Sequence, residues 1–418
     1  MGGILMESLL ERFLRYVKID TQSSESSYTH PSTPGQMQLA KLLVAELQKL
    51  SLTNINLSDN GYIMAELPAN SNNTFPVIGF IAHLDTSPDV SGKDVKPMLF
   101  PDYDGQDLVL NPAENTVMKV QDHPELKEYI GHTIITSNGH TLLGADDKAG
   151  VAAIMNALAI LKSKPEIKHG KIMVAFTPDE EIGQGADNFD VAGFGADFAY
   201  TVDGGPVGEL EYETLNAAIS QIDLQGINVH PGTAYMHMHN AILAAMELNS
   251  MLPVNQRPKY TRDREGFFHL TQMSGTVEKA KMTYIIRDHD RNEFEQKKDY
   301  LQSCVDFLNR RYGEERIVVQ MQDQYYNMKE KIEPFFHIVA LAEQAMLDNN
   351  ITPIIKPIRG GTNGARLSFM GLPCPNIFTG GHNFHSRFEF ISLESMEKAS
   401  QVIIRIIQLA ESQSSVPK

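Results

Sequence analysis

The chain has 418 residues, and its 36 Lys and Arg against 52 Asp and Glu give a formal net charge of −16. So acidic a protein lacks the basic surface that binds nucleic acid or an anionic membrane, and we expect neither as a partner. Hydrophobic residues make up 42% and charged residues 21% of the sequence, which is typical of a globular protein. A chain of this length normally divides into more than one domain, and we expect two.

The two cysteines, Cys304 and Cys374, lie far apart in the sequence. They form no C-x-x-C motif, which excludes a disulfide scaffold, a zinc ribbon and a thioredoxin-type motif and favours a reducing compartment. The short apolar start runs straight into Glu7 and Arg12, unlike a signal peptide. The apolar run 151–161 is too short to span a bilayer. We therefore expect a cytoplasmic protein.

The first part of the chain alternates helical and buried-strand patterns. Residues 6–18 are amphipathic, and Thr33-Pro34 begins a helix that extends to about Leu50. Strands are expected at 77–82, 141–143, 171–177 and 198–202, with an apolar helix at 148–162. Strands that are apolar on both faces and separated by helices indicate a mostly parallel sheet covered by helices on both sides.

The middle of the chain follows a different pattern. The expected order is strand 215–225, helix 240–251, strands 268–277 and 280–288, helix 292–312 and strand 316–323. This β-α-β-β-α-β order is that of a split βαβ sandwich. The first pattern then returns with helix 335–349, strands 353–357 and 375–378, and helix 392–411. We therefore predict an α/β domain of residues 1–214 and 326–418 that holds an inserted α+β domain of residues 215–325.

Histidines and carboxylates follow the predicted strands of the α/β domain. These segments are His83-Leu84-Asp85, Gly144-Ala145-Asp146-Asp147-Lys148, Pro178-Asp179-Glu180-Glu181 and Asp203-Gly204-Gly205, with His382 and His385 near the last strand. Ligands of open α/β sheets bind at the carboxyl ends of the strands. We therefore expect these side chains to gather at one edge of the sheet.

Each segment alone has an ordinary explanation, such as a favourable charge at a helix N-terminus or a turn. Together they are harder to explain, because several carboxylates at one edge repel one another and burial raises that cost. No cluster of Lys or Arg flanks these strand ends, so we infer that a pair of divalent metal ions compensates the charge. Mixed histidine and carboxylate ligation suits zinc or a neighbouring transition metal better than magnesium or calcium.

Motifs of other common chemistries are absent from the sequence. It contains no G-x-S-x-G, no H-E-x-x-H, no Walker loop and no G-x-G-x-x-G between a strand and a helix. Neither cysteine has a neighbour suited to activating a thiolate. The acidic cluster is therefore the strongest functional signal in the sequence.

The segments at the predicted strand ends resemble the motifs of the M20 family of dizinc peptidases. Further agreement lies at residues 16–23, 31–35, 229–234, 357–362 and 367–381, so the resemblance extends from about residue 8 to residue 411. These longer segments are similar to those of family members that act as tripeptide aminopeptidases. The resemblance implies a zinc-peptidase-like α/β catalytic domain, with residues 215–325 as its lid and dimerisation domain.

Residue by residue, the resemblance implies two zinc ions. His83, Asp146 and Asp203 would hold one ion, while Glu181, His385 and the shared Asp146 would hold the other. A carboxylate suits the bridging position because each of its oxygens can serve one metal. Cobalt and manganese accept the same ligands, so the sequence leaves the native metal open.

The resemblance also assigns roles to two further carboxylates. Asp85 would accept the other ring N–H of His83 and fix its tautomer. Glu180 would be the general base on a metal-bridging hydroxide and would later pass the proton to the leaving amine. The peptide between Asp146 and Asp147 is implied to be cis.

Substrate-binding residues follow from the resemblance less directly. His230 is similar to a lid histidine that stabilises the oxyanion, although an ordinary loop histidine would look the same. Arg287 is similar to a lid arginine that holds the peptide carboxylate, with a surface salt bridge as the ordinary alternative. Arg359, Asn240 and Asn363 are further candidates. The sequence departs from the family pattern at Tyr235, at Asn363 and at Ser386-Arg387-Phe388.

We therefore expect a dizinc aminopeptidase that hydrolyses the N-terminal peptide bond of short peptides, with a preference for tripeptides. An M20 amidase, deacylase or carboxypeptidase-like hydrolase is the alternative among enzymes. A catalytically retired member that only binds peptides or metals is the alternative among binding proteins. Hinges near residues 214 and 325 would let the lid open and close. The lid is also implied to mediate a homodimer, in which His230 serves its own subunit or that of a partner.

Overall fold

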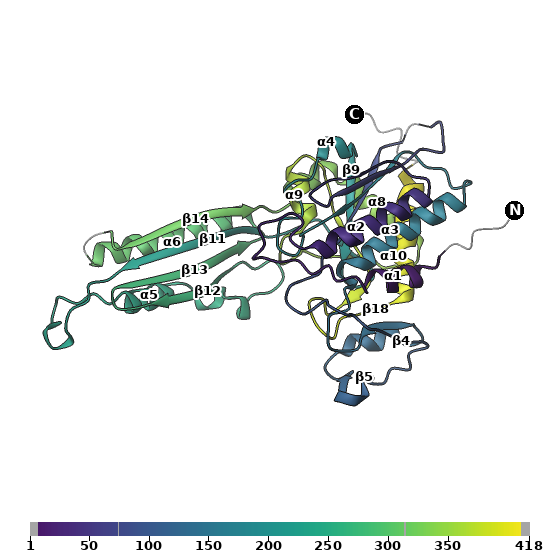
Figure 1. Ribbon diagram of the computed structural model, residues 1–418. Coiled ribbons are helices and arrows are strands. Elements are labelled where there is room, and N and C mark those ends of the chain that lie inside the picture. The colour runs from purple at the N-terminus through teal and green to yellow at the C-terminus, as the bar shows by residue number, and fades with distance from the viewer. Residues whose placement is uncertain (1–6, 74, 313–314, 411–418) are drawn as a thin grey trace. The chain divides into compact units, whose positions relative to one another are not determined.

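Helices and strands lie close to the positions expected from the sequence in the computed structural model, which describes residues 7–73, 75–312 and 315–410 (Figure 1). Residue 6 of the expected first helix and residue 411 of the expected last helix lie outside the described residues. The described residues form two compact units. The first contains the described residues up to Tyr212, residues 331–356 and the described residues from Thr362 onward, and the second contains residues 213–330 and 357–361.

The first unit contains a large sheet with parallel strands at its centre. In spatial order its strands are β1 (Thr53–Leu57), β2 (Ile63–Leu67), β8 (Ile172–Thr177), β3 (Ile78–His83), β9 (Phe198–Gly204), β16 (Asn376–Phe378), β10 (Glu209–Glu211) and β15 (Ile354–Ile355). The neighbours β8, β3, β9 and β16 run parallel. Every residue of β3 and β8 is buried, as expected for strands covered on both faces. The predicted α/β sheet is confirmed.

Helices and loops of the first unit cover both faces of this sheet. The helices are α1 (Leu9–Tyr16), α2 (Pro34–Lys49), α3 (Ala145–Ser163), α4 (Val191–Phe194), α7 (Lys329–Ile332, which overlaps the unit boundary), α8 (His337–Asp348), α9 (Asn363–Phe369) and α10 (Leu393–Leu409). On one face α3 packs on β3 and β9, and α10 packs on α3 and α8. On the other face Ile81 of β3 lies in a core cluster with Phe194 of α4 and Leu367 of α9. Among the described residues, every helix is too short or too polar to span a bilayer.

A smaller sheet in the first unit was not expected from the sequence. Its strands, in spatial order, are β17 (Gly381–His382), β18 (Phe390–Ser392), β7 (Ile134–Ser137) and β4 (Pro97–Phe100), and β5 (Leu108–Asn111) pairs with β6 (Thr116–Met118) nearby in the chain. The strand expected at 141–143 is wrong, because this segment is irregular. Its N–H groups instead bond to a loop carbonyl at Ser91 and to the carboxylate of Glu389.

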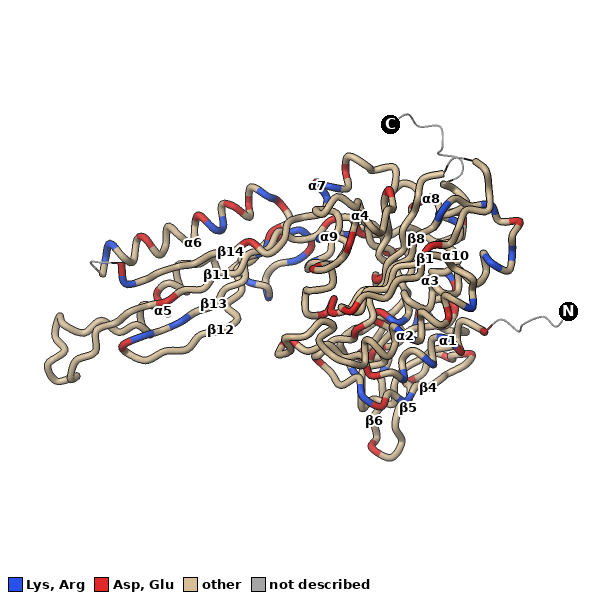
Figure 2. Tube along the Cα trace, turned by 45° about the horizontal axis from the view of Figure 1, so that its top comes forward, with Lys and Arg blue, Asp and Glu red and all other residues tan. Residues whose placement is uncertain are grey.

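The second unit contains an antiparallel sheet with two long helices packed on it. Its strands lie in the order β12 (Phe267–Gly275), β13 (Lys279–Asp288), β11 (Asn216–Gln225) and β14 (Ile317–Tyr325), and its helices are α5 (Ala241–Met251) and α6 (Arg291–Tyr312). Both helices contact β11 and β13, and Met282, Tyr284 and Ile286 of β13 are buried in the core between them. Figure 2 shows both basic and acidic residues along α6, and among them Arg291, Asp306 and Arg310 are exposed. The predicted β-α-β-β-α-β order is confirmed.

Candidate metal centre

The carboxyl ends of three parallel strands bring the centre together. His83 is the last residue of β3, Asp203 is the next-to-last residue of β9, and Glu180 and Glu181 follow the end of β8. Because these strands are neighbours in a parallel sheet, their carboxyl ends meet at one edge. Asp146 lies at the start of α3, where its φ and ψ of −83° and 104° are not helical, and the peptide that follows it is cis, as predicted.

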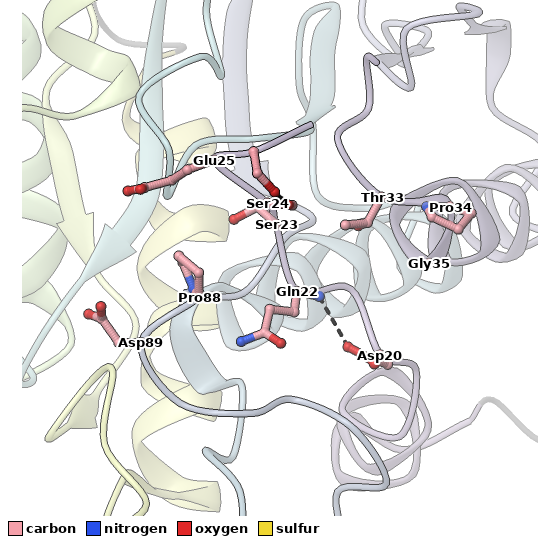
Figure 3. Close-up of a pocket in the computed structure, with 11 residues that line it drawn as sticks. Asp20, Gln22, Ser23, Ser24, Glu25, Thr33, Pro34, Gly35, Pro88 and Asp89 are labelled. Atoms are coloured by element: carbon pink, nitrogen blue, oxygen red, sulfur yellow. Dashed lines mark hydrogen bonds between the residues drawn. The ribbon is translucent and has the colours of Figure 1, made fainter. Parts of the chain in front are cut away.

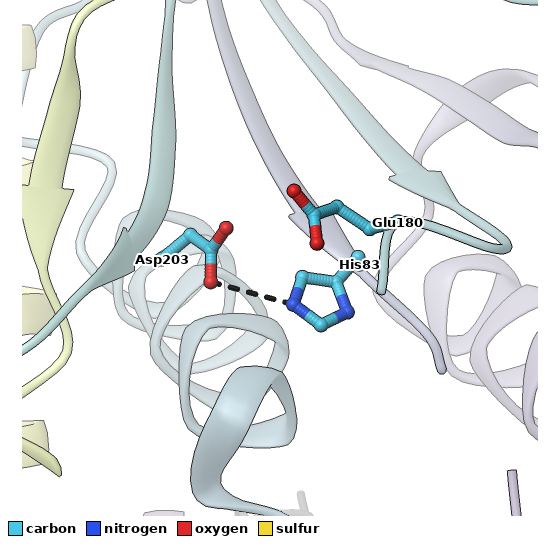
Figure 4. A group of neighbouring side chains, drawn as sticks. All are labelled: His83, Glu180 and Asp203. Carbon is cyan, nitrogen blue, oxygen red and sulfur yellow. Dashed lines mark ion pairs between the residues drawn. The ribbon is translucent and has the colours of Figure 1, made fainter. Parts of the chain in front are cut away.

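The Asp146 carboxylate lies between two histidines. Its Oδ1 is 2.9 Å from Nε2 of His83, and its Oδ2 is 3.4 Å from Nε2 of His385. His385 Nε2 is also 2.9 Å from Oε2 of Glu181. The same nitrogen of His83, Nε2, also lies 3.4 Å from Oδ1 of Asp203. Figure 4 marks this ion pair with a dashed line. The two oxygens of Asp146 therefore face two separate groups of ligand atoms.

Two sets of side chains have ligand atoms that lie within 4.8 Å of one another. One set is His83, Glu180 and Asp203, and the other is His83, Asp146 and Glu181. The structure thus brings all the expected ligands of the first unit into one cluster, with His385 joined to it through Glu181. It also places Glu180 beside His83 and Asp203, and Figure 4 shows its carboxylate directed toward them.

Asp85 contacts the centre in a way that the sequence did not reveal. Nδ1 of His83 is closer to the backbone carbonyl of Asp85, at 3.0 Å, than to its Oδ1, at 3.3 Å. The Asp85 carboxylate instead accepts the N–H groups of Glu180 and Glu181, at 2.9 and 3.1 Å. Asp85 is fully buried. It therefore fixes the backbone of the loop after β8 as well as the ring of His83.

Burial shifts the proton affinities of the clustered groups. Burial raises the pKa of Glu181 to about 7, and the negative charge of Asp146 contributes to this increase. Burial also raises the pKa of Asp203 to about 6, although the neighbouring His83 opposes this increase. Burial likewise raises the pKa of Glu180 well above its usual range. Bonds to Asp146 and Glu181 raise the pKa of His385 to about 11. The burial of Glu180, Glu181 and Asp203 therefore favours the protonated forms of these three acids.

The chemistry of this cluster fits divalent metal ions. Its histidine nitrogens and carboxylate oxygens are the donors that zinc and its neighbours prefer. Oε1 of Glu181 is buried and has no hydrogen-bond partner within the described part of the chain, although buried polar atoms are normally paired. A metal ion would satisfy such an oxygen and would replace the protons that the acids otherwise need.

Several residues around the cluster, of which Asp89 is exposed, have contacts that the sequence did not reveal. The carboxylate of Asp147 accepts the N–H of His83 at 3.0 Å, and that of Asp89 is 3.0 Å from Nδ1 of His385. The side-chain oxygen of Asn376 accepts the N–H of Asp203 at 3.2 Å. Glu389 accepts backbone N–H groups of the loop that carries Asp146. The only sign in the sequence that Glu389 contacts this loop is its position four residues after His385.

A pocket lies next to the loop that carries Asp89. It has a volume of about 810 Å³ and polar walls (Figure 3), formed by Asp20, Gln22, Ser23, Ser24, Glu25, Ser26, Thr33, Pro34, Gly35, Pro88 and Asp89. Because Asp89 also contacts His385, the pocket adjoins the cluster. His382, in contrast, is not part of the cluster, because it stacks on Phe390 and bonds to Tyr129.

The predicted substrate-binding residues are divided between the units. Asn363 belongs to the first unit, where it is buried and donates to the hydroxyl of Thr177 at 3.0 Å. His230, Asn240, Arg287 and Arg359 belong to the second unit. His230 is exposed, and its Nδ1 accepts the N–H of Gly232 at 3.1 Å. The carboxamide oxygen of Asn240 caps α5.

The two candidate arginines of the second unit, Arg287 and Arg359, are held by oxygen acceptors. Arg287 donates to the backbone carbonyls of Ala218 and Ile286 and to the side chain of Gln324, each at 3.0 Å. Arg359 donates to the carbonyl of Asp263 at 2.7 Å. Within the described part of the chain, Arg287 thus bonds to neutral acceptors and forms no ion pair, unlike the surface salt bridge that was its ordinary alternative.

Comparison with known proteins gives one family and one fold. The model of peptidase family M20/M25/M40 matches residues 136–409. Peptidase T of Alkaliphilus oremlandii (strain OhILAs) is 59% identical over 406 residues, which cover 97% of this chain and 99% of the relative. The crystal structure of aminopeptidase PepT from Bacillus cereus ATCC 10987 superposes with a TM-score of 0.77 at 23% identity, covering 96% of this chain and 98% of that one. A dinuclear metal-binding M20 peptidase from Bacillus subtilis superposes with a TM-score of 0.64 at 14% identity, covering 97% and 98%.

Proposed function

The chain belongs to peptidase family M20/M25/M40, and from this membership we propose that it removes the N-terminal residue of short peptides, tripeptides above all. Membership of the family makes the chain a metallopeptidase, which hydrolyses peptide bonds. The high identity to a peptidase T along nearly the whole chain supports the aminopeptidase activity and the preference for tripeptides.

Two zinc ions complete the centre in this proposal. His83, Asp146 and Asp203 would hold one ion, and Glu181 and His385 would hold the other with Asp146 shared. The observation that carries the proposal is the Asp146 carboxylate, whose two oxygens lie against different histidines. When bound, the ions would polarise the carbonyl of the scissile bond and lower the pKa of water. Cobalt and manganese suit the same donors.

Glu180 is the general base of the proposed reaction. Its carboxylate takes a proton from the attacking water and delivers it to the nitrogen of the leaving amine. Two features support this role. A carboxylate oxygen of Glu180 lies within 4.8 Å of ligand atoms of His83 and Asp203, and the Glu180 N–H is held at 2.9 Å by Asp85. The base is thereby kept beside the reacting bond.

Substrate recognition is assigned to residues of both units. We propose that His230 stabilises the oxyanion and that Arg287, Arg359 and Asn240 bind the ends of the peptide, together with Asn363. Within the described residues the acceptors of Arg287 are all neutral, which supports its role, because a peptide carboxylate would supply the charged partner that this arginine lacks there.

We further propose that residues 215–325 are the lid and dimerisation domain, between residues 1–214 and 326–418 of the catalytic domain. Leu243 and Met246 of α5 are 60% and 56% exposed, and such a surface supports association with a second copy of the chain. The two cysteines of the chain, which are buried and unpaired, support a location in the reducing cytoplasm.

Hydrolysis of a defined peptide by metal-stripped and reloaded protein tests the proposal. Zinc, cobalt or manganese should restore cleavage of Ala-Gly-Phe into alanine and Gly-Phe, with slower cleavage of di- and tetrapeptides. N-acetyl-Ala-Gly-Phe should stay intact, because acetylation removes the free amino terminus. Cleavage of the acetylated peptide would identify an amidase or deacylase, and release of phenylalanine would identify a carboxypeptidase-like enzyme. Either result would contradict the proposal.

Substitution of the base separates an enzyme from a retired binding protein. Glu180→Gln should keep its zinc and lose about 100- to 10,000-fold in kcat, whereas Glu114→Gln, at an exposed glutamate of the same unit, should keep full activity. Zinc binding without cleavage of any peptide by the unsubstituted protein would identify a retired member. A mixture of Glu180→Gln and His230→Ala proteins should regain activity if His230 acts across a dimer, and stay inactive if it acts within its own subunit.

A further inference from the structure

A buried carboxylate next to the metal centre accepts three backbone hydrogen bonds and is not a predicted ligand. Both oxygens of Glu389, which is 1% exposed, accept backbone N–H groups. Oε2 accepts from Leu143 at 2.7 Å and from Gly144 at 2.8 Å, and Oε1 accepts from Asp146 at 2.9 Å. Three donors within four residues of one loop thus converge on a single buried side chain.

This loop needs an external support because its own backbone provides little. Gly144 has a φ of +83° and caps α3 without a side-chain hydrogen bond, and the first residues of α3 have non-helical dihedral angles. The N–H groups at the start of a helix have no partner within the helix. Glu389 supplies both of its carboxylate oxygens as acceptors for them.

The position of Asp146 therefore depends on Glu389. The N–H of Asp146 is held by Glu389, while its carboxylate oxygens lie against His83 and His385. Glu389 is itself anchored one residue before β18, which pairs with β7. The segment between β17 and β18 thus provides His385 through its side chain and determines the position of Asp146 through Glu389.

We propose that Glu389 is a positioning residue of the metal centre, which holds the Asp146 loop so that the Asp146 carboxylate can bridge two metal ions. This inference rests on the proposed function, because it concerns the same centre. A residue that merely stabilised the loop would affect unfolding and leave metal affinity unchanged. Metal affinity therefore distinguishes the two roles.

The test compares Glu389→Gln with a matched control, Glu394→Gln. Gln keeps the shape of the side chain but replaces one accepting oxygen with a donor, so at least one N–H of the loop loses its partner. Glu394 also accepts a backbone N–H with both oxygens, that of Thr133 at 3.1 and 3.0 Å, and its partners in the described structure, Thr133 and His132, are not predicted metal ligands. Zinc affinity is measured by competition with a chromophoric chelator, and Co²⁺ absorption spectra report the coordination.

Glu389→Gln should bind zinc about 10- to 100-fold more weakly, the usual effect of losing a residue that orients a ligand. Its Co²⁺ spectrum should change, and with saturating zinc its kcat should fall while KM for Ala-Gly-Phe stays constant. Glu394→Gln should match the unsubstituted protein in each measurement. Unchanged zinc affinity and Co²⁺ spectrum in a folded Glu389→Gln protein would overturn the inference.

A second variant keeps the test decisive if Glu389→Gln does not fold. Glu389→Asp retains the charge, but its carboxylate is one methylene shorter and cannot reach all three N–H groups. Reduced zinc affinity in this variant supports the inference, and unchanged affinity overturns it. Failure of the proposed function gives a different result, because the unsubstituted protein would then bind no zinc or cleave no peptide.

Discussion

Replacement of Asp85 by Asn tests how the loop after β8 is held. The Asp85 carboxylate is fully buried and accepts the N–H groups of Glu180 and Glu181 through separate oxygens, at 2.9 and 3.1 Å. Asn has nearly the same shape but only one accepting oxygen. One of the two N–H groups will therefore face an amide N–H₂ group and lose its partner.

The expected cost follows from these two bonds. A buried N–H without a partner costs about 1–3 kcal/mol, and the remaining bond loses about 1 kcal/mol because its acceptor is no longer charged. We therefore expect Asp85→Asn to lower the free energy of unfolding of the zinc-loaded protein by about 2–4 kcal/mol. Because the base and one predicted ligand lie on the displaced loop, kcat/KM should fall by about 10- to 100-fold.

Urea unfolding of the zinc-loaded protein and hydrolysis of Ala-Gly-Phe measure the two effects. Asp197→Asn is the control, because Asp197 accepts the N–H of Val77 at 2.8 Å at the other end of β3 and is exposed. The control should lose no more than about 1 kcal/mol of stability and keep its kcat. If Asp85→Asn unfolds and turns over like the unsubstituted protein, the reasoning from these bonds is wrong.

Three further predictions concern pH, the second unit and the metal. Burial raises the pKa of Glu211 from 4.5 to about 7, and the charge of Glu209 adds to this increase. The contribution of Glu211 to the free energy of unfolding is therefore fully present below pH 4.5 and is lost as the pH rises through 7. In urea unfolding, Glu211→Gln should therefore raise the free energy of unfolding by up to about 3 kcal/mol at pH 8 and by little at pH 4.5. An equal increase at the two pH values would contradict this reasoning. Leu301→Ala, in the fully buried core of the second unit, should cost about 2–5 kcal/mol in thermal unfolding and leave zinc affinity unchanged in a chelator titration. Chelation should lower the unfolding midpoint, and zinc at 100 times its Kd should restore about 2.7 kcal/mol, whereas a midpoint independent of zinc would argue against a metal centre.

Features that depend on local sequence were predictable. The apolar run before His83 indicates a strand buried on both faces, and β3 is buried throughout. Alternating apolar residues from Ala280 to Ile286 predict a strand with one buried face, and β13 has that pattern. Carboxylates and histidines at strand ends predict a cluster at one sheet edge, because parallel strands align their carboxyl ends there. His83, Asp146, Glu181, Asp203 and His385 are among the residues found on this basis, and the resemblance to the M20 family singled them out as the expected ligands.

Features that depend on contacts between distant segments were not predictable. Glu389 lies 243 residues from Asp146 in the chain and binds only its backbone, which leaves no side-chain pattern to detect. The bond from the Glu180 N–H to Asp85 spans 95 residues and is hidden for the same reason. Strands such as β18 contain only three residues, too few to show a periodicity, so the smaller sheet was missed.

Pairing between β11 and β14 has a consequence for how such a protein can evolve. Ala217 near the start of β11 is the register partner of Tyr325 at the end of β14, so neighbouring strands about 4.8 Å apart carry the chain into and out of the second unit. The turn at 276–278, at the opposite end of this sheet, can lengthen or shorten without moving these two strand ends. Insertions and deletions there can diversify the second unit over generations, while the segments that lead into β11 and out of β14 stay one strand apart.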